Sequence, residues 1–399
     1  MNQLLAITKN TYLQAVRQPV YGLIVLITLG GIALAPAVTG WTLDDDNKML
    51  RDIGLSTLLI QGLFLACFAA ASVLDVEIED RTVLTVTSKP VSRPIFILGK
   101  YIGVLGALLT AHYLALIGYL MSMRHGVLQS AAESSDITVL VFGPGAMLLV
   151  MLVAGALNYA FEWRFLPSVI ALALPTLTIG GVILLVVNRD FKFASYESVQ
   201  EIGPLPAGLD QPGVFKDIIT FRPNAGNEKL SGHIGSLVRS NWKGPISDED
   251  RRYLLGLVDD VQWRKNVNFL VKETRKADEF EILKASVLVF GAIAILGAVA
   301  LAAATRLSVV PTFILNLVVI MGGLASDQMI RPEAEKGKQW AAILYDVIPN
   351  FQCFWMVDAL EESRLIPVTY VVSTLGYAGL LVLALLLLAM ALFETREVG

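Results

Sequence analysis

Residues 285–305 of this chain read ASVLVFGAIAILGAVALAAAT, a run with no charged side chain. A helix rises about 1.5 Å per residue, so about 20 apolar residues suffice to cross roughly 30 Å of hydrocarbon. Lipid offers no hydrogen-bond partners to an open backbone, so a segment that crosses it must be helical. The run therefore predicts a transmembrane helix, and it decides the class of the fold.

Seven further segments of the 399-residue chain have the same character. Hydrophobic residues make up 55% of the chain and charged residues 17%, with a mean hydropathy of +0.63. Few soluble domains combine these values. We predict an all-α polytopic membrane protein with about eight transmembrane helices, at 20–40, 55–74, 95–121, 138–160, 166–187, 285–305, 309–326 and 367–393.

Two segments outside the spans have a character of their own. Residues 1–19 predict an amphipathic helix that lies in the membrane surface, with Pro19 allowing the turn into the first span. Residues 188–284 form the large polar insertion, which holds fifteen basic and fifteen acidic residues and recurrent aromatic side chains. We interpret this insertion as a small α+β extracytoplasmic domain. The chain thus divides into 1–19, the first five spans (20–187), the domain at 188–284, and the last three spans (285–399).

Within the last part, residues 327–366 leave the apolar pattern but remain rich in Trp, Tyr and Phe. Aromatic side chains of this kind favour the membrane interface, so we expect short helices at the outer surface. An even number of spans places both termini on one side. Short segments on the terminal side carry nine Lys or Arg against seven on the other side. This modest bias agrees with cytoplasmic termini, and the resemblance of the segment 77–100 described below carries that orientation.

The charged residues fall in loops or at span ends, with Asp327 the most marginal. Ion-coupled carriers keep ionisable groups at mid-membrane for function, so the pattern disfavours a proton pump. The chain has no G-x-x-x-x-G-K-[ST] phosphate loop, three His and two Cys, so we expect no enzyme activity, bound cofactor or metal. Cys67 and Cys353 are interpreted as packing residues. No basic tract suggests nucleic acid.

Three polar residues lie inside predicted spans: Gln61, His112 and Asn158. A substrate or proton ligand is one interpretation of His112. Polar side chains in bundles commonly form hydrogen bonds between helices, and we favour this second interpretation for all three residues.

The segment 75–94 is the charged connection between the second and third spans. Its acidic residues precede an apolar group and then Pro90, and a second, shorter inner connection carries Glu162 and Arg164. A short rigid helix at the membrane surface, with acids toward its start, could dock in a soluble motor and pass force to the spans. The alternative is an ordinary solvated loop whose charges set topology. The residues alone favour this alternative, and the docking helix is favoured only by the family resemblance given next. The candidate residues of the segment are Glu77, Glu79, Asp80, Arg81, Thr82, Val83, Leu84, Pro90, Ser92 and Arg93.

The stretch 77–100, EIEDRTVLTVTSKPVSRPIFILGK, resembles the cytoplasmic loop of the permease subunits of type-2 ABC transporters, the ABC-2 family. An acidic stretch, a Thr-hydrophobic pair, a Pro-Val-Ser-Arg turn and a Gly-Lys carry the resemblance. The surface helix at 1–19, the second inner connection and the last third of the chain are also similar to that family. The chain departs from the family at Arg81, where Gly is frequent.

The resemblance implies a permease subunit that works in pairs, as a homo- or heterodimer, with a separate ABC ATPase subunit. ATP and Mg would bind in that partner, and the cargo would be exported. It also implies the inner (cytoplasmic) membrane, contact with membrane lipids, and a possible periplasmic partner for 188–284. The alternative function is a membrane-anchored scaffold whose outer domain holds a partner without transport.

Overall fold

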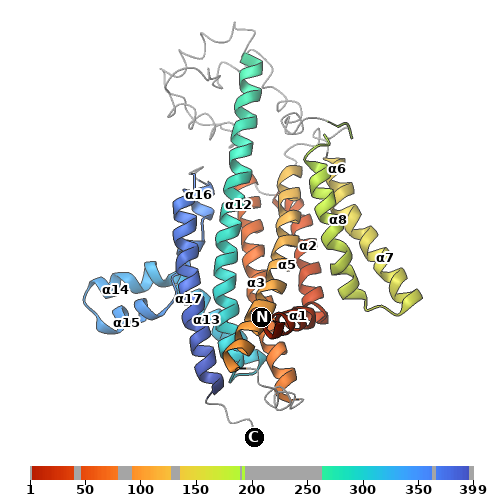
Figure 1. Ribbon diagram of the computed structural model, residues 1–399. Coiled ribbons are helices and arrows are strands. Elements are labelled where there is room, and N and C mark those ends of the chain that lie inside the picture. The colour runs from red at the N-terminus through yellow and green to blue at the C-terminus, as the bar shows by residue number, and fades with distance from the viewer. Residues whose placement is uncertain are drawn as a thin grey trace.

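The computed structural model describes residues 2–39, 46–79, 92–126, 135–188, 191–193, 263–361 and 365–394. In these ranges the chain is almost entirely helical, and the long helices stand side by side in an elongated bundle (Figure 1). Eight helices among the described residues are long and apolar enough to cross a membrane. This confirms the predicted multi-pass helical membrane protein.

The spans follow the predicted order, and several are longer than predicted. The fourth is interrupted by a π-helical segment, η1 (Val141–Gly145), which joins two α-helical parts. The helices that form the spans are α2 (Pro19–Thr39), α3 (Asp46–Glu79), α5 (Arg93–His125), α6 (Ile137–Leu140) with α7 (Ala146–Phe161), α8 (Phe165–Leu184), α12 (Trp263–Ala304), α13 (Val309–Ala325) and α17 (Val368–Glu394).

The predicted α+β domain falls largely outside the described residues, which lack 194–262. From Trp263 the chain is already helix α12, which runs without a break through 284 to Ala304 and rises above the other spans in Figure 1. An isolated β-bridge joins Val187 to Phe193, and the described ranges contain no strand. The last part of the insertion is therefore a direct extension of a span.

The centre of the bundle is made by α3 and α12. α12 packs along α3, α5, α13 and α17, and α3 also contacts α2 and α5. Small residues allow this close approach: a Cβ atom added to Gly62 of α3 would lie 2.3 Å from the side chain of Ile293 on α12. Helices in lipid are held chiefly by such packing, because lipid tails are as apolar as the side chains.

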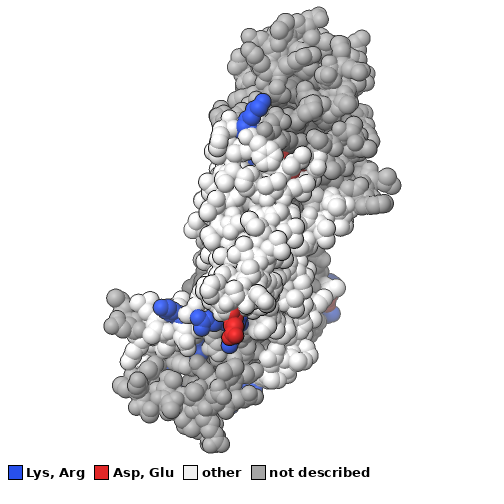
Figure 2. Space-filling view, turned by 90° about the vertical axis from the view of Figure 1, so that its right-hand side faces the viewer, with Lys and Arg blue, Asp and Glu red and all other residues white. Residues whose placement is uncertain are grey.

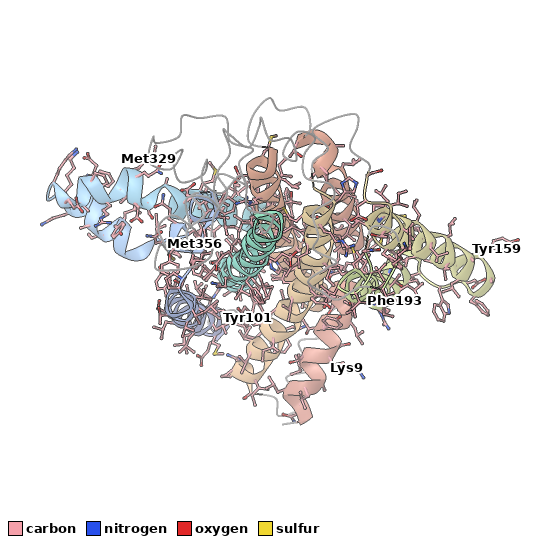
Figure 3. All side chains as sticks on the ribbon, turned by 90° about the horizontal axis from the view of Figure 1, so that it is seen from above. Lys9, Tyr101, Tyr159, Phe193, Met329 and Met356 are labelled. Atoms are coloured by element: carbon pink, nitrogen blue, oxygen red, sulfur yellow. The ribbon has the colours of Figure 1, made fainter. Side chains whose placement is uncertain are left out.

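A helix, α1 (Asn2–Val16), is present where the N-terminal surface helix is predicted, and its place in the membrane surface stays a prediction. Seen from above in Figure 3, α1, marked by Lys9, lies lengthwise across the direction of the spans. It rests on α5 where Gly99, Gly103 and Gly106 leave room for it. A Cβ atom on Gly103 would lie 2.5 Å from the Cβ of Thr11. α1 is therefore fitted into a groove of α5, while Leu5 on its other side is 61% exposed.

Between α13 and α17 the described residues form five short helical segments. They are η2 (Ser326–Ile330), α14 (Arg331–Glu335), α15 (Gln339–Val347), a 3-10 turn η3 (Gln352–Phe354) and α16 (Val357–Glu361). In Figure 1, α14 and α15 project sideways beside the middle of α17, whereas α16 lies near the start of α17. The predicted short helices of 327–366 are present; their place at the outer surface stays a prediction.

On the face of the bundle that carries α7 and α8, the described residues form a belt without charged side chains (Figure 2). Lys, Arg, Asp and Glu lie on either side of this belt. Its exposed side chains include Leu148, Leu152 and Ile179. Such a surface is suited to hydrocarbon, as the sequence predicts.

Candidate functional site

The candidate site is the end of the bundle at which the segment 75–94 joins α3 to α5. α5 begins at Arg93, directly after Ser92, which has extended backbone dihedrals, and Pro94 occupies the first turn. Proline is tolerated there because the first turn has no intrahelical partner for its missing N–H group. The Pro-Val-Ser-Arg turn thus ends where the helix starts, and the chain is helical for seven residues before Lys100.

Arg93 connects the start of α5 to the end of α17. Its Nη1 donates a hydrogen bond to the carbonyl oxygen of Glu394, at 3.2 Å. Arg306, in the turn between α12 and α13, donates from Nη2 to the carbonyl oxygen of Leu392, at 2.9 Å. The last carbonyl groups of a helix lack intrahelical partners and carry partial negative charge, so both guanidinium groups stabilise this terminus.

Lys100 lies about two helical turns after Arg93 and connects α5 to α3. Its side chain is buried, and Nζ lies 3.5 Å from the carbonyl oxygen of Val73. The ammonium group also lies 5.4 Å from the ring centre of Phe96, which stacks on Phe393 of α17. A buried ammonium group requires such partners, because its desolvation is costly. The ends of α3, α5 and α17 therefore form one packed unit.

The predicted acidic residues occupy a different local structure from the one expected. Glu77 and Glu79 belong to the last turn of α3, a helix of 34 residues, rather than to the start of a separate surface helix. The helix dipole opposes acidic side chains at this position, so the predicted dipole argument does not apply to them. The other candidates before Ser92 lie outside the described residues: Asp80, Arg81, Thr82, Val83, Leu84 and Pro90.

The second inner connection is a tight turn between α7 and α8. Glu162 has a left-handed backbone (φ 57°, ψ 24°), and its N–H donates to the carbonyl oxygen of Asn158 at 3.0 Å, which ends α7. Arg164 precedes the first residue of α8, and both charged side chains are exposed. The neighbouring aromatic side chains also point outward, with Tyr159 93% exposed.

The structure does not bring the two inner connections together. In Figure 1 the turn between α7 and α8 lies at one side of the bundle, apart from the lower ends of α3, α5 and α17. Figure 3 places Tyr159 at the far edge and Tyr101 near the middle. A partner that touches both connections would have to cover a broad part of this face.

The polar residues inside the spans behave mostly as predicted. His112 Nε2 lies 2.9 Å from Ser286 Oγ of α12, and Gln61 Nε2 donates to the carbonyl oxygen of Ala111 on α5 at 3.5 Å. Both are contacts between helices. Asn158 differs, because its Nδ2 donates to the carbonyl oxygen of Trp163 in the adjoining turn. Its side chain therefore supports the turn instead of a second span.

The role of Arg306 could not be predicted, because its hydrogen-bond partner lies 86 residues further along the chain. Lys100 was assigned to the end of a span, and its burial against Val73 and Phe96 was not predicted. Both cysteines are free thiols, and Cys67 is fully buried, in keeping with a packing role. The described residues contain no group of three or more His, Cys, Asp or Glu side chains suited to a metal ion.

Comparison of this chain with known protein families, with curated proteins and with solved structures finds no match.

Proposed function

We propose that this chain is the transmembrane permease subunit of an ABC-2-like transporter and that it exports a substrate together with a separate ATPase. The observation that carries the proposal is the segment 77–100, with its acidic stretch, Thr-hydrophobic pair, Pro-Val-Ser-Arg turn and Gly-Lys. ATP and Mg would bind in the ATPase, and two permease chains would form the translocation path between them.

The attachment of both ends of the segment 75–94 supports a mechanical role. α3 continues to Glu79, so the segment begins on a rigid helix, and it ends where Arg93 and Lys100 hold α5 to α17 and α3. A helix packed against its neighbours transmits displacement along its length, because close-packed protein interiors have low compressibility. A push on the segment would therefore move α3 and α5 together.

The position of α3 extends this path. α3 packs along α12, and α12 continues beyond the bundle into the insertion at 188–284. Motion received at the inner segment would reach the outer insertion through two contacting helices. This coupling is what a transporter with an outer domain requires, and a scaffold that only anchors a partner does not.

Photocrosslinking tests the proposal in the intact cell. A photoreactive phenylalanine is placed at Leu84, on the predicted docking face, or at Arg164, in the second inner connection. Trp340 on α15, which is 58% exposed, is the control position. We expect Leu84 to capture a nucleotide-binding protein and Trp340 to capture none.

Capture of the same proteins from all three positions would contradict a dedicated docking surface. No capture at Leu84, together with a partner captured from positions within 188–262, would instead favour the scaffold. Capture at Leu84 but not at Arg164 would leave the first segment as the docking surface and remove the second connection from it.

A further inference from the structure

A cavity of about 610 Å³ lies between α2, α5, the α6–η1–α7 helix and α8, apart from the inner site. Its volume falls within the range of about 300–1,000 Å³ that is usual for ligand pockets. Residues of six helical elements line it, and three of these residues are methionines: Met121, Met147 and Met151. Methionine is flexible and polarizable, so it adapts to apolar ligands of irregular shape.

The cavity exists because of local features of two helices. On α2, Gly30 faces the cavity, and a Cβ atom added there would meet no atom within 4 Å. Opposite it, η1 contributes Gly143 and Pro144, and π-helical geometry widens the helix at this point. A regular helix with larger side chains would fill this space, so Gly30 and the π-helical segment leave the cavity open.

The lining selects hydrocarbon over polar ligands. Ser122 is one of the few polar groups that face the cavity, and its hydroxyl already donates to the carbonyl oxygen of Ile32 at 2.8 Å. His125 lies at the end where α5 terminates, with Nδ1 2.9 Å from the carbonyl oxygen of Gly126. A ligand that fits has an apolar chain and a polar group at the His125 end.

The surface around the cavity determines where such a ligand would come from. α2 and α7 expose apolar side chains beside it: Ile27 and Leu34 on α2 are 65% and 64% exposed, and Leu152 on α7 is 72% exposed. The charge-free belt of Figure 2 covers this part of the molecule. The solvent at the opening is therefore the hydrocarbon of the bilayer.

We propose that this cavity binds one acyl chain of a membrane phospholipid, with the headgroup toward His125. The site is formed by one copy of this protein and does not involve the ATPase. It differs from general lipid contact with an outer surface, because the acyl chain would lie between α2 and α7 instead of along them.

A matched pair of glycine substitutions tests the proposal. Gly30→Leu fills the cavity, whereas Gly31→Leu adds the same side chain one residue further on, away from the cavity lining. A Cβ atom meets nothing within 4 Å at either position, so both variants should fold. Ala33→Leu, also on the lining, is a second filling variant.

The probe is a phosphatidylcholine with a diazirine in the middle of one acyl chain. The full-length protein in nanodiscs containing this lipid is irradiated, digested and mapped by mass spectrometry. We expect label on Met147 and Met151, reduced at least fivefold in Gly30→Leu and Ala33→Leu and unchanged in Gly31→Leu. Thermal unfolding of each variant confirms that it is folded.

Three results would overturn the proposal. Equal labelling of Met147 and Met151 in all variants would show ordinary surface lipid only, and so would label confined to outward residues such as Leu152, which is 72% exposed and outside the cavity lining. Loss of a dimer on size-exclusion chromatography in Gly30→Leu, with no labelling of the methionines in the parent protein, would show that a second copy of the chain covers this face.

Discussion

The contact between α1 and α5 makes a sharp quantitative prediction through Gly103→Ala. The added Cβ would lie 2.5 Å from the Cβ of Thr11 and 2.8 Å from the carbonyl oxygen of Thr8. The second atom belongs to the backbone, so a rotamer change does not relieve the clash and α1 must move away. Overpacking of this kind costs about 1–3 kcal/mol.

The control is Gly376→Ala on α17, where a Cβ would meet no atom within 4 Å. Both changes gain about 0.5–1 kcal/mol of helix propensity, so the difference between them isolates the clash. At about 1.4 kcal/mol per factor of ten, a cost of about 1–3 kcal/mol raises the population of detached α1 roughly 5- to 100-fold.

The assay is alkylation of a Thr11→Cys variant, because Thr11 is fully buried when α1 is docked. We expect its labelling to be roughly 5- to 100-fold faster with Gly103→Ala and unchanged with Gly376→Ala. Equal rates in the two glycine variants would refute the close packing of α1 on α5. Label on Thr11→Cys as fast as on an exposed cysteine at position 5 in the parent would mean that α1 is not docked at all.

Three other predictions follow from individual contacts. Ser286→Ala should lower the free energy of unfolding by about 1 kcal/mol, because His112 Nε2 loses its hydrogen-bond partner. Thermal unfolding measures this loss, with Ser373→Ala as the exposed control. Glu281→Ala should cost about 1–3 kcal/mol, because the carboxylate accepts the buried N–H of Ile366 at 2.7 Å, and equal unfolding temperatures would contradict that contact. Burial raises the pKa of the Cys353 thiol to about 11, so its thiolate is scarce at pH 8 and its alkylation rate should rise about tenfold per pH unit up to pH 10, whereas an ordinary thiol levels off near pH 9.

The spans and α1 could be predicted because their signals are local. An apolar run of 20 residues has one stable structure in lipid, and a change from that run to a polar stretch marks its end. The same local signal underestimated α12, since the polar residues from Trp263 to Lys284 continue the helix outside the apolar part. Helix propensity does not stop at the edge of the hydrocarbon, and hydropathy does not report it.

The contacts that build the candidate site join residues that are far apart in the sequence. Arg93 and Arg306 meet the carbonyl groups of α17 across 301 and 86 residues, and no spacing rule links them. Asn158 was wrongly assigned to a contact between helices because a short turn follows α7, and its side chain closes that turn. The cavity beside Gly30 could not be predicted either, because it arises from the packing of helices that are far apart in the chain.

The most direct test of the central claim is purification of the full-length chain from its native membrane in a mild detergent, followed by mass spectrometry and an ATPase assay. The account predicts a stoichiometric nucleotide-binding subunit, lost when residues 77–84 are scrambled and retained when the equally long charged stretch 331–338 is scrambled, with both variants folded. Purification of the intact chain with no ATPase, or an ATPase that remains bound after 77–84 is scrambled, would contradict it.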